Sequence, residues 1–163
     1  MDIIDLTQEE GECLPVLAIE VTGPPPPMPR MRYYRGGFYN SAKKSLLKFR
    51  GVVSSQIPGK GGVPFPRGVL VSVKVKFYMR RPLVDFKNGS RVCGAMKSLA
   101  PFARPTRPDI DNLVKYVLDG LNGIAYEDDR QVVKLEAYKL LDNEAGCEGR
   151  TTIEIREFVA EDN

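Results

Sequence analysis

Residues 107–133 read RPDIDNLVKYVLDGLNGIAYEDDRQVV, and this stretch decides the fold. Its apolar residues recur at spacings of three and four, which predicts a single amphipathic helix from about 110 to 121. The predicted apolar stripe consists of Ile110, Leu113, Val114, Val117, Leu118 and Leu121. Gly123 should end this helix, because glycine adopts the left-handed conformation of a helix cap at little cost. A short acidic turn then leads into a strand near 131–141.

On either side of this stretch, the pattern alternates between strands and helices without a strict βαβ repeat. The further predicted elements are a strand at 15–22, a hairpin over 30–40, a helix at 42–56 and strands at 69–79 and 150–158. The first strand is apolar nearly throughout, which indicates burial on both faces. The core candidates of the helix at 42–56 are Leu46, Leu47, Val52 and Val53. We therefore expect an α+β fold with a mixed sheet and two main helices.

A chain of 163 residues and 18.2 kDa, 42% of it hydrophobic, is long enough for one domain with a real core. We expect a flexible acidic tail at 1–14, one domain at 15–158 and a short C-terminal tail at 159–163. The basic connection at 80–108 is unusually long for a loop, and such length indicates a function.

The composition excludes several classes of chemistry. Histidine is absent, so no Ser-His-Asp or Cys-His machinery and no imidazole base is available. Cys13, Cys93 and Cys147 lie too far apart in sequence for a zinc motif or a disulfide framework. No apolar run approaches a membrane span, and the N-terminus does not resemble a signal peptide. These features predict a soluble intracellular protein of a reducing compartment.

The net charge of +3 conceals three blocks of opposite sign. Residues 1–20 carry −6, residues 30–108 carry +17 and residues 109–163 carry −8. Aromatic residues are interleaved with the basic block, and this pattern favours a nucleic-acid partner whose phosphates the cations neutralise. A broadly solvated basic surface is the alternative interpretation.

Two acids and a lysine gather where the predicted helix of about 110–121 begins. Asp109 and Asp111 are two residues apart, and Lys115 follows Asp111 by one helical turn. Asp128 and Asp129 come after the helix, and a strand running back could return them to its start. Clustered carboxylates suit Mg²⁺, which supports phosphodiester hydrolysis without histidine.

Each of these residues also has a purely structural interpretation. Asp111 could be only a helix N-cap, and Asp111 with Lys115 only an exposed pair of one helical turn. Asp128 and Asp129 could be only turn residues. Spacing alone does not exclude these alternatives.

The same residues carry a family resemblance. The stretch 107–133 resembles the signature of RusA Holliday-junction resolvases: a D-x-D-N-x-x-K helix start, a D-[AG]-L helix end and a D-D-x-Q-[VI] turn into a strand. The proline-rich segment, basic hairpin and helix that open the chain are also similar to that family, as is FYMRRP at 77–82. The similarity spans about residues 16–158, although the acidic tail and the 81–106 loop depart from it.

The resemblance implies a single RusA-like domain that forms a homodimer and resolves four-way DNA junctions by paired nicks, in DNA recombination and repair. It implies that Asp109, Asp111 and Asp129 bind catalytic Mg²⁺, for which Mn²⁺ could substitute, and that Lys115 is catalytic. Asp128 matches the neighbouring acid of the family's motif. With the basic block, the candidate DNA-binding residues are Arg30, Arg32, Arg35, Lys43, Lys44, Arg80, Arg81 and Arg107.

Two other functions remain open at this point. One is a non-catalytic module that binds junctions or single strands, although such a module gains nothing from acids clustered near phosphate. The other is a nuclease specific for flaps or forks.

In the acidic tail, Ile3, Ile4 and Leu6 resemble a SUMO-interacting motif, for which chance within a disordered tail is the alternative. A real motif would place the protein in a eukaryotic nucleus, and otherwise we expect the cytoplasm.

Overall fold

The structure of the protein is a computed structural model. The residues it describes are 16–28, 32–34, 37–39, 43–59, 62–91, 95–144, 146 and 148–160. The acidic tail, with the SUMO-like Ile3, Ile4 and Leu6, lies outside the described residues. Among the described residues, no helix is long and apolar enough to cross a membrane.

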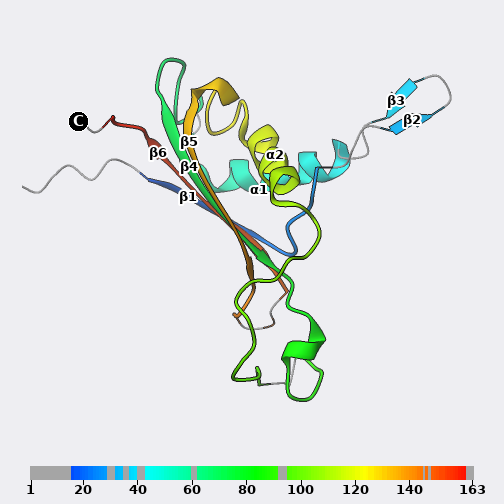
Figure 1. Ribbon diagram of the computed structural model, residues 1–163. Helices are drawn as coiled ribbons and strands as arrows, with labels where there is room; N and C mark the ends of the chain where they lie inside the picture. Colours follow the sequence, from blue (N-terminus) through cyan, green and yellow to red (C-terminus); the bar gives the residue numbers. More distant parts are fainter. Residues whose placement is uncertain are drawn as a thin grey trace, which may run out of the picture.

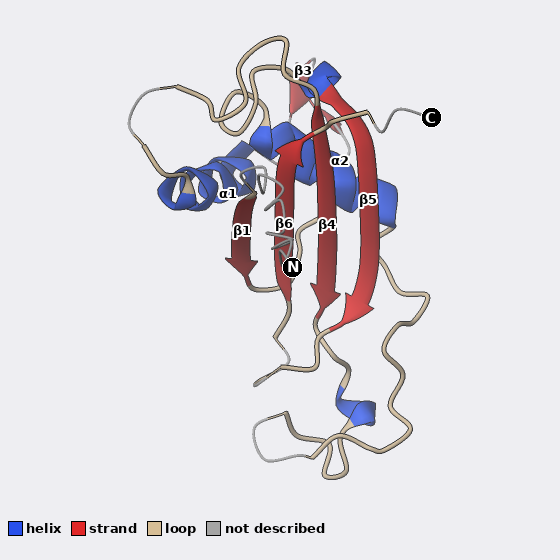
Figure 2. Cartoon of the chain, turned by 90° about the vertical axis from the view of Figure 1, so that its left-hand side faces the viewer, coloured by secondary structure: helices blue, strands red, loops and turns tan. Residues whose placement is uncertain are grey.

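A four-stranded mixed sheet forms the frame of the molecule (Figures 1 and 2). Its strands, in spatial order, are β1 (Leu17–Thr22), β6 (Arg150–Glu157), β4 (Val71–Met79) and β5 (Val132–Leu141). β6 is antiparallel to both of its neighbours, whereas β4 and β5 run parallel. The expected mixed α+β architecture is thus confirmed. A separate hairpin pairs β2 (Arg32–Tyr34) with β3 (Gly37–Tyr39), as predicted for 30–40.

Two helices cover one face of this sheet, α1 (Lys43–Gln56) and α2 (Ile110–Leu121), and the core lies between the two layers (Figure 2). The central strand β4 alternates strictly, so that four of its side chains enter the core while the intervening polar ones face away. The buried members are Val71, Val73, Val75 and Phe77. The alternation predicted for 69–79 is therefore confirmed.

The burial of β1 and of α1 differs from the sequence-based expectation. β1 was expected to be buried on both faces, but only Ile19 is fully buried, and Ala18 and Glu20 are exposed. The expectation was wrong because β1 is an edge strand of a sheet that has helices on one face only. The same error affects α1, where Phe49 and Val53 are buried while Leu47 is 61% exposed.

The buried face of α2 is rotated from the predicted stripe. The residues that face the core are Leu113, Tyr116, Val117, Gly120 and Leu121. Ile110 is exposed instead, and Val114 and Leu118 are only partly buried, Val114 packing against the margin of the core. The rotation follows from the contact with α1, where the Phe49 ring packs edge-to-face on Tyr116 at 5.3 Å between centroids. Helix α2 ends at Asn122 and Gly123 as predicted, with Gly123 at φ 73°.

The described residues of 80–108, which are 80–91 and 95–108, form a lobe below the sheet, drawn in green in Figure 1, which we call the connecting lobe. It joins the end of β4 to the start of α2. It contains one 3-10 turn, η1 (Leu83–Asp85), and a short bridge between Phe86 and Met96. Phe86 is 3% exposed, so this segment has a small buried centre of its own.

Candidate active site

Two carboxylates occupy the start of α2, at the place the sequence predicts. Asp109 is the residue that precedes the helix, and Asp111 lies in its first turn. Both are exposed, and among the described residues neither makes a hydrogen bond or an ion pair. The interpretation of Asp111 as a helix cap is therefore wrong: Asp109 holds the cap position, and its side chain does not cap. Two negative charges stand free at a helix N-terminus, where the helix dipole tolerates them.

A groove opens beside these carboxylates. It has a volume of about 700 Å³ and is lined by Pro27, Arg107, Pro108, Asp109 and Asn112. The proline-rich segment after β1 forms one wall, fixed by a hydrogen bond from the Met28 amide to the Asn112 carbonyl at 3.2 Å. The groove thus combines a cation, an amide and a carboxylate at one helix start.

A lysine of the edge strand β5 holds the backbone of residues 106–108, which directly precedes Asp109. Lys139 Nζ donates to the carbonyls of Thr106 at 2.6 Å and Pro108 at 3.0 Å. Because Lys139 lies near the end of β5, these bonds fix the start of α2 against that end of the sheet. Sequence reasoning assigned no role to this lysine.

Lys115 lies one turn along α2 from Asp111 and is exposed. The described residues show no ion pair between the two, so the interpretation as a helix-surface pair gains no support. Among the residues that the structure describes, the Lys115 ammonium group has no acidic partner.

The acidic turn before β5 has a structural organisation of its own. Asp128 caps the short 3-10 helix η2 (Asp129–Gln131) by accepting from the Arg130 amide at 3.0 Å. Its carboxylate also pairs with the Arg130 guanidinium, with Nη2 and Oδ2 at 2.6 Å. These bonds hold the pKa of Asp128 well below its ordinary value. Asp128 therefore builds the turn, and Asp129 beside it remains exposed.

Gln131 holds this turn on the protein, and sequence reasoning missed that role. Its side-chain oxygen accepts from the amides of Glu127 and Asp128, both at 3.0 Å. Its amide nitrogen donates to the carbonyls of Phe65, Pro66 and Val69 in the loop before β4, at 2.8 to 3.3 Å. The only signal in the sequence was the glutamine of the D-D-x-Q motif.

The structure does not bring the two acidic groups together within one chain. Asp109 lies next to the end of β5, whereas Asp129 directly precedes the start of β5. The two groups lie beyond opposite ends of α2, whose twelve residues span about 18 Å because a helix rises about 1.5 Å per residue. Accordingly, no three metal-binding side chains cluster within the part of the chain that the structure describes. The expected return of Asp128 and Asp129 to the helix start does not occur.

The predicted DNA-binding residues separate into four groups. Lys43, Lys44 and Arg107 are exposed, as a phosphate contact requires. Arg81 is a correction: it is 2% exposed and bound to Asp85 inside the connecting lobe, so it is unable to reach a ligand.

Arg80 is exposed but pairs with Glu148, with Nε and Oε2 at 2.9 Å. Arg30 and Arg35 lie outside the described residues, and for Arg32 only the backbone, in β2, is described.

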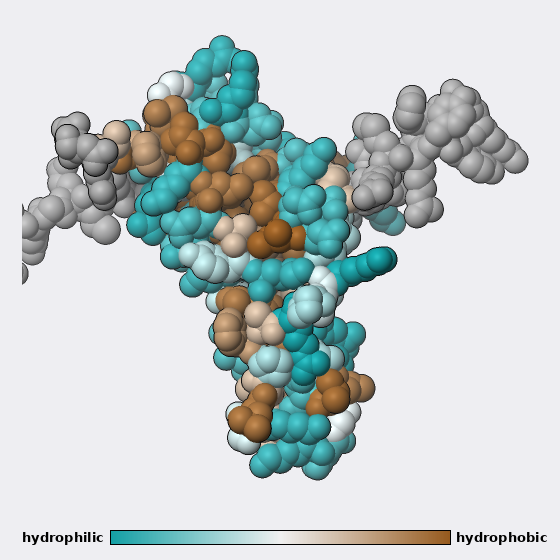
Figure 3. All heavy atoms as spheres, viewed as in Figure 1, coloured by the Kyte–Doolittle hydropathy of each residue, from teal (hydrophilic) through white to brown (hydrophobic). Residues whose placement is uncertain are grey.

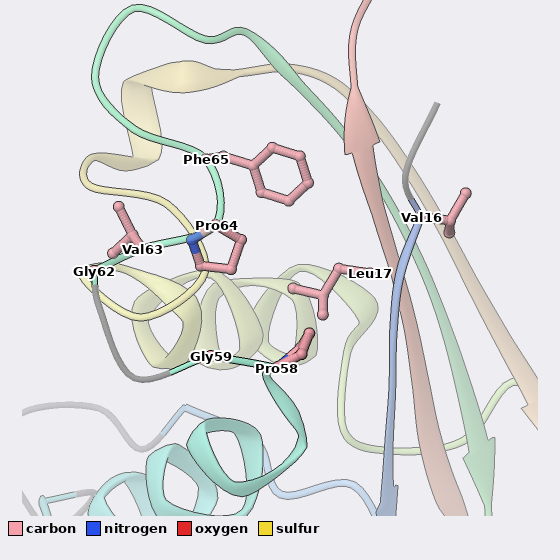
Figure 4. A pocket seen from close by; sticks show the side chains of 8 residues that line it. All are labelled: Val16, Leu17, Pro58, Gly59, Gly62, Val63, Pro64 and Phe65. Carbon is pink, nitrogen blue, oxygen red and sulfur yellow. The ribbon is translucent and has the colours of Figure 1, made fainter. Parts of the chain in front are cut away.

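A second cavity, of about 290 Å³, lies between the start of β1 and the loop after α1 (Figure 4). Leu17 and Phe65 are among its lining residues, and none of the eight side chains that line it is titratable. It is therefore no candidate for the chemistry that the carboxylates suit.

Fold and site together define a small α+β domain with a one-sided mixed sheet and an acidic helix start beside a groove. A family model described as Endodeoxyribonuclease RusA matches residues 22–156. The chain belongs to this family. It is also 40% identical over 91 residues to the uncharacterized protein YqaN of Bacillus subtilis (strain 168). That match covers 55% of this chain and 59% of YqaN, so the chain spans less than two thirds of that relative's length.

Proposed function

We propose that the protein is a metal-dependent endodeoxyribonuclease that resolves four-way DNA junctions in recombination and repair. The observation that carries the proposal is the pair of exposed carboxylates of Asp109 and Asp111, which have no partner among the described residues and lie beside a groove that Arg107 lines. Membership of the RusA family supports the same reaction class. A protein that only binds DNA would gain nothing from two uncompensated negative charges facing phosphates.

Asp109 and Asp111 fit a hard divalent cation. Mg²⁺ is held in many enzymes by one or two carboxylates, with waters and substrate phosphate oxygens completing its shell. When bound, such an ion supplies activation of a water nucleophile and stabilisation of charge on the phosphate. Mn²⁺ has similar ligand preferences and should substitute.

The remaining groups of the site would position the substrate. Arg107 would hold a phosphate at the mouth of the groove, and Lys115 would reach the same strand from one turn along α2. Asn112 contributes an amide at the groove floor. Lys139 would not touch the substrate. It would position Arg107, because its ammonium group holds the carbonyls of the residues on both sides of Arg107.

The separation of Asp129 from Asp109 and Asp111 favours a homodimer. Helix α2 contacts strand β5, and both elements carry apolar side chains that are exposed or only partly buried. We call this set the α2–β5 flank; its members are Ile110, Val114, Leu118, Val133 and Leu135. β5 is also an edge strand, and its outer edge has no partner in the four-stranded sheet. In Figure 3 a continuous hydrophobic area occupies the middle of the molecule.

A second copy is the occupant that fits this flank. A two-fold axis across α2 places the start of one helix opposite the end of the other. Asp129 of one copy would then lie near Asp109 and Asp111 of its partner, which completes two equivalent acidic sites. Two sites in one dimer also suit paired nicks in a junction of near two-fold symmetry.

The decisive experiment compares cleavage of a four-way junction, a flap, a fork and a linear duplex. We expect paired nicks in the junction with Mg²⁺ or Mn²⁺, and none in excess EDTA. Cleavage confined to flaps or forks would support the rival nuclease instead. Junction binding without cleavage under any metal condition would support the non-catalytic module and overturn the proposal.

We further propose that Ile3, Ile4 and Leu6 contact SUMO, which would place the protein in the nucleus. A pull-down of the full chain on immobilised SUMO, with Ile3→Ala and Ile4→Ala as the comparison, tests the contact. Binding that is lost in the double variant would support the SUMO contact and a nuclear location. If the parent protein does not bind SUMO, both proposals are wrong.

A further inference from the structure

The connecting lobe is held together by a buried ion cluster. Asp85 is 2% exposed and forms ion pairs with Arg81, at 3.0 Å, and with Arg104. Arg81 Nε also donates to the carbonyl of Asp142 at 2.7 Å, and its Nη1 to that of Pro101 at 2.9 Å. These bonds tie both ends of the lobe to each other and to the residue that follows β5. The lobe is therefore a preorganised surface.

Two large apolar side chains project from this fixed surface. The Lys97 amide donates to the Asp85 carbonyl at 2.9 Å, and the Leu141 amide donates to the Phe102 carbonyl at 2.7 Å. Between these two anchors Leu99 is 94% exposed, and Phe102 itself is 77% exposed. In Figure 3 the tip of the lobe shows hydrophobic groups among hydrophilic neighbours. Their backbone is fixed while their side chains meet only water, which is a costly arrangement for a protein without a partner there.

The charge of the lobe identifies the kind of partner. Residues 80–108 contain seven lysines and arginines and a single acid, Asp85. Asp85 is already engaged by two of the arginines, whereas Lys87, Lys97 and Arg107 are exposed without an acidic partner among the described residues. Free cations that alternate with apolar and aromatic side chains match phosphates that alternate with base faces.

The lobe is also fixed relative to Asp109. Its last residues are held through the carbonyls of Thr106 and Pro108 on Lys139. Phe102 is seven residues from Asp109, which limits their separation to about 25 Å even for a fully extended chain. That distance is less than one turn of duplex DNA, about 34 Å. A nucleic acid cleaved beside Asp109 would therefore pass within reach of the lobe.

We propose that Leu99 and Phe102 form a wedge that packs against unstacked bases at a DNA branch point, and that the connecting lobe thereby distinguishes branched from continuous DNA. The inference rests on the proposed function for its ligand, and it adds a reader of branching to the site. Apolar side chains that enter an intact duplex must break base stacking, which costs free energy. A branch point already exposes base faces, so the wedge gains stacking there without that cost.

The test measures binding alone, in EDTA, with a four-way junction and a continuous duplex of matched sequence. For the double variant Leu99→Ala with Phe102→Ala, junction affinity should fall about tenfold while duplex affinity stays unchanged. With 2-aminopurine at the branch point, the protein should raise the fluorescence and the double variant should not. Two controls are Lys97→Ala, which should weaken both DNAs equally and lower the salt slope by about 1, and Val159→Ala, which should change neither.

The contrary outcomes are distinct. An equal loss on junction and duplex, or no loss on either, would overturn the wedge. A shift in sedimentation of the DNA-free double variant would show that a second copy covers the lobe, and loss of binding to anionic vesicles would show a membrane partner. Each of these also overturns the inference. Because no readout uses cleavage, failure of the proposed function and failure of the wedge are observed separately.

Discussion

Asp109 and Asp111 place two negative charges at one helix N-terminus, and no described side chain neutralises either of them. The positive end of the α2 dipole offsets part of that repulsion, by about 0.3–1 kcal/mol for each charge. The rest is a cost in the free protein that a bound cation would remove. Stability and function therefore make opposite demands on these two residues.

The variants Asp109→Asn and Asp111→Asn should separate the two demands. Neither carboxylate makes a hydrogen bond in the described structure, so unfolding free energy should change by less than about 0.5 kcal/mol. Cleavage should fall by orders of magnitude, because each change removes a charge that holds the metal. Urea unfolding and junction nicking measure the two effects, with exposed Glu157→Gln on β6 as the control. A variant that nicks at the parental rate would remove its residue from the site.

Asp128 should show a strongly lowered pKa that depends on Arg130. The side-chain bond from Arg130 is the largest cause of the shift, followed by the bond from its amide. A lowered pKa in the folded state stabilises the protein above the ordinary aspartate value of 3.8, and this stabilisation is lost as the pH falls through the folded-state pKa. Carboxyl NMR titration of Arg130→Ala should show the Asp128 pKa move up towards 3.8. An unchanged pKa would contradict the assignment of the ion pair as its cause.

At the scale of elements, the crossing of α1 and α2 depends on a residue without a side chain. A Cβ at Gly120 would overlap the Phe49 ring, which itself packs on Tyr116. Arg50 of α1 further ties the helices together, since its Nη1 donates to the carbonyls of Asp119 and Asn122 at the end of α2. The glycine allows the close approach that these contacts require.

Gly120→Ala should therefore destabilise the protein although alanine favours helices. The higher helix propensity of alanine should stabilise the folded state by about 1 kcal/mol. Overpacking against the confined Phe49 ring should destabilise it by about 1–3 kcal/mol, and we expect this cost to exceed the gain. Gly51→Ala in α1 is the matched control, because no atom lies within 4 Å of its added Cβ, and it should stabilise by roughly 0.5–1 kcal/mol. Urea unfolding gives both values. Equal stabilisation by the two changes would show that the helices do not cross closely at Gly120.

Periodicity in the sequence predicted the elements well and their surroundings poorly. The alternation of β4 and the end of α2 at Gly123 depend on local chemistry, and both predictions are confirmed. The exposure of Leu47 and of one face of β1 depends on which elements lie next to them. The hydrophobic pattern along the sequence does not contain that information, because it predicts every apolar residue on the inner face to be in the core.

In the candidate site, too, features that are local in sequence could be predicted, and features that depend on the tertiary structure could not. The start of α2 was predictable because Asp109, Asp111 and Lys115 are neighbours in sequence. The position of Asp129 was not, since it depends on the direction in which β5 runs past α2. The burial of Arg81 depends on Asp85 and on the backbone after β5, which no local motif reveals.

At the scale of the whole molecule, the α2–β5 flank should hold two copies together. Leu135 is 43% exposed on the edge strand, so Leu135→Lys should be tolerated by a single chain but not at a two-fold interface. Sedimentation should show about 36 kDa for the parent, twice the 18.2 kDa chain, and a monomer for the variant. Leu47→Lys on α1, at a leucine that is 61% exposed, is the control and should remain dimeric. A parent that sediments as a monomer at micromolar concentration would exclude the dimer.

Co-expression of two inactive variants should then reveal whether each acidic site is shared between copies. In a dimer of one Asp111→Asn chain and one Asp129→Asn chain, one site carries both defects and the other has every carboxylate intact. Random pairing makes half of the dimers mixed, so about a quarter of all sites should be active, and they should make single nicks. Mixing Asp109→Asn with Asp111→Asn should restore nothing, because every site then lacks one acid of the same pair. Junction nicking by the unfractionated co-expressed proteins measures this, and equal activity of the two mixtures would show that Asp129 does not complete the partner's site.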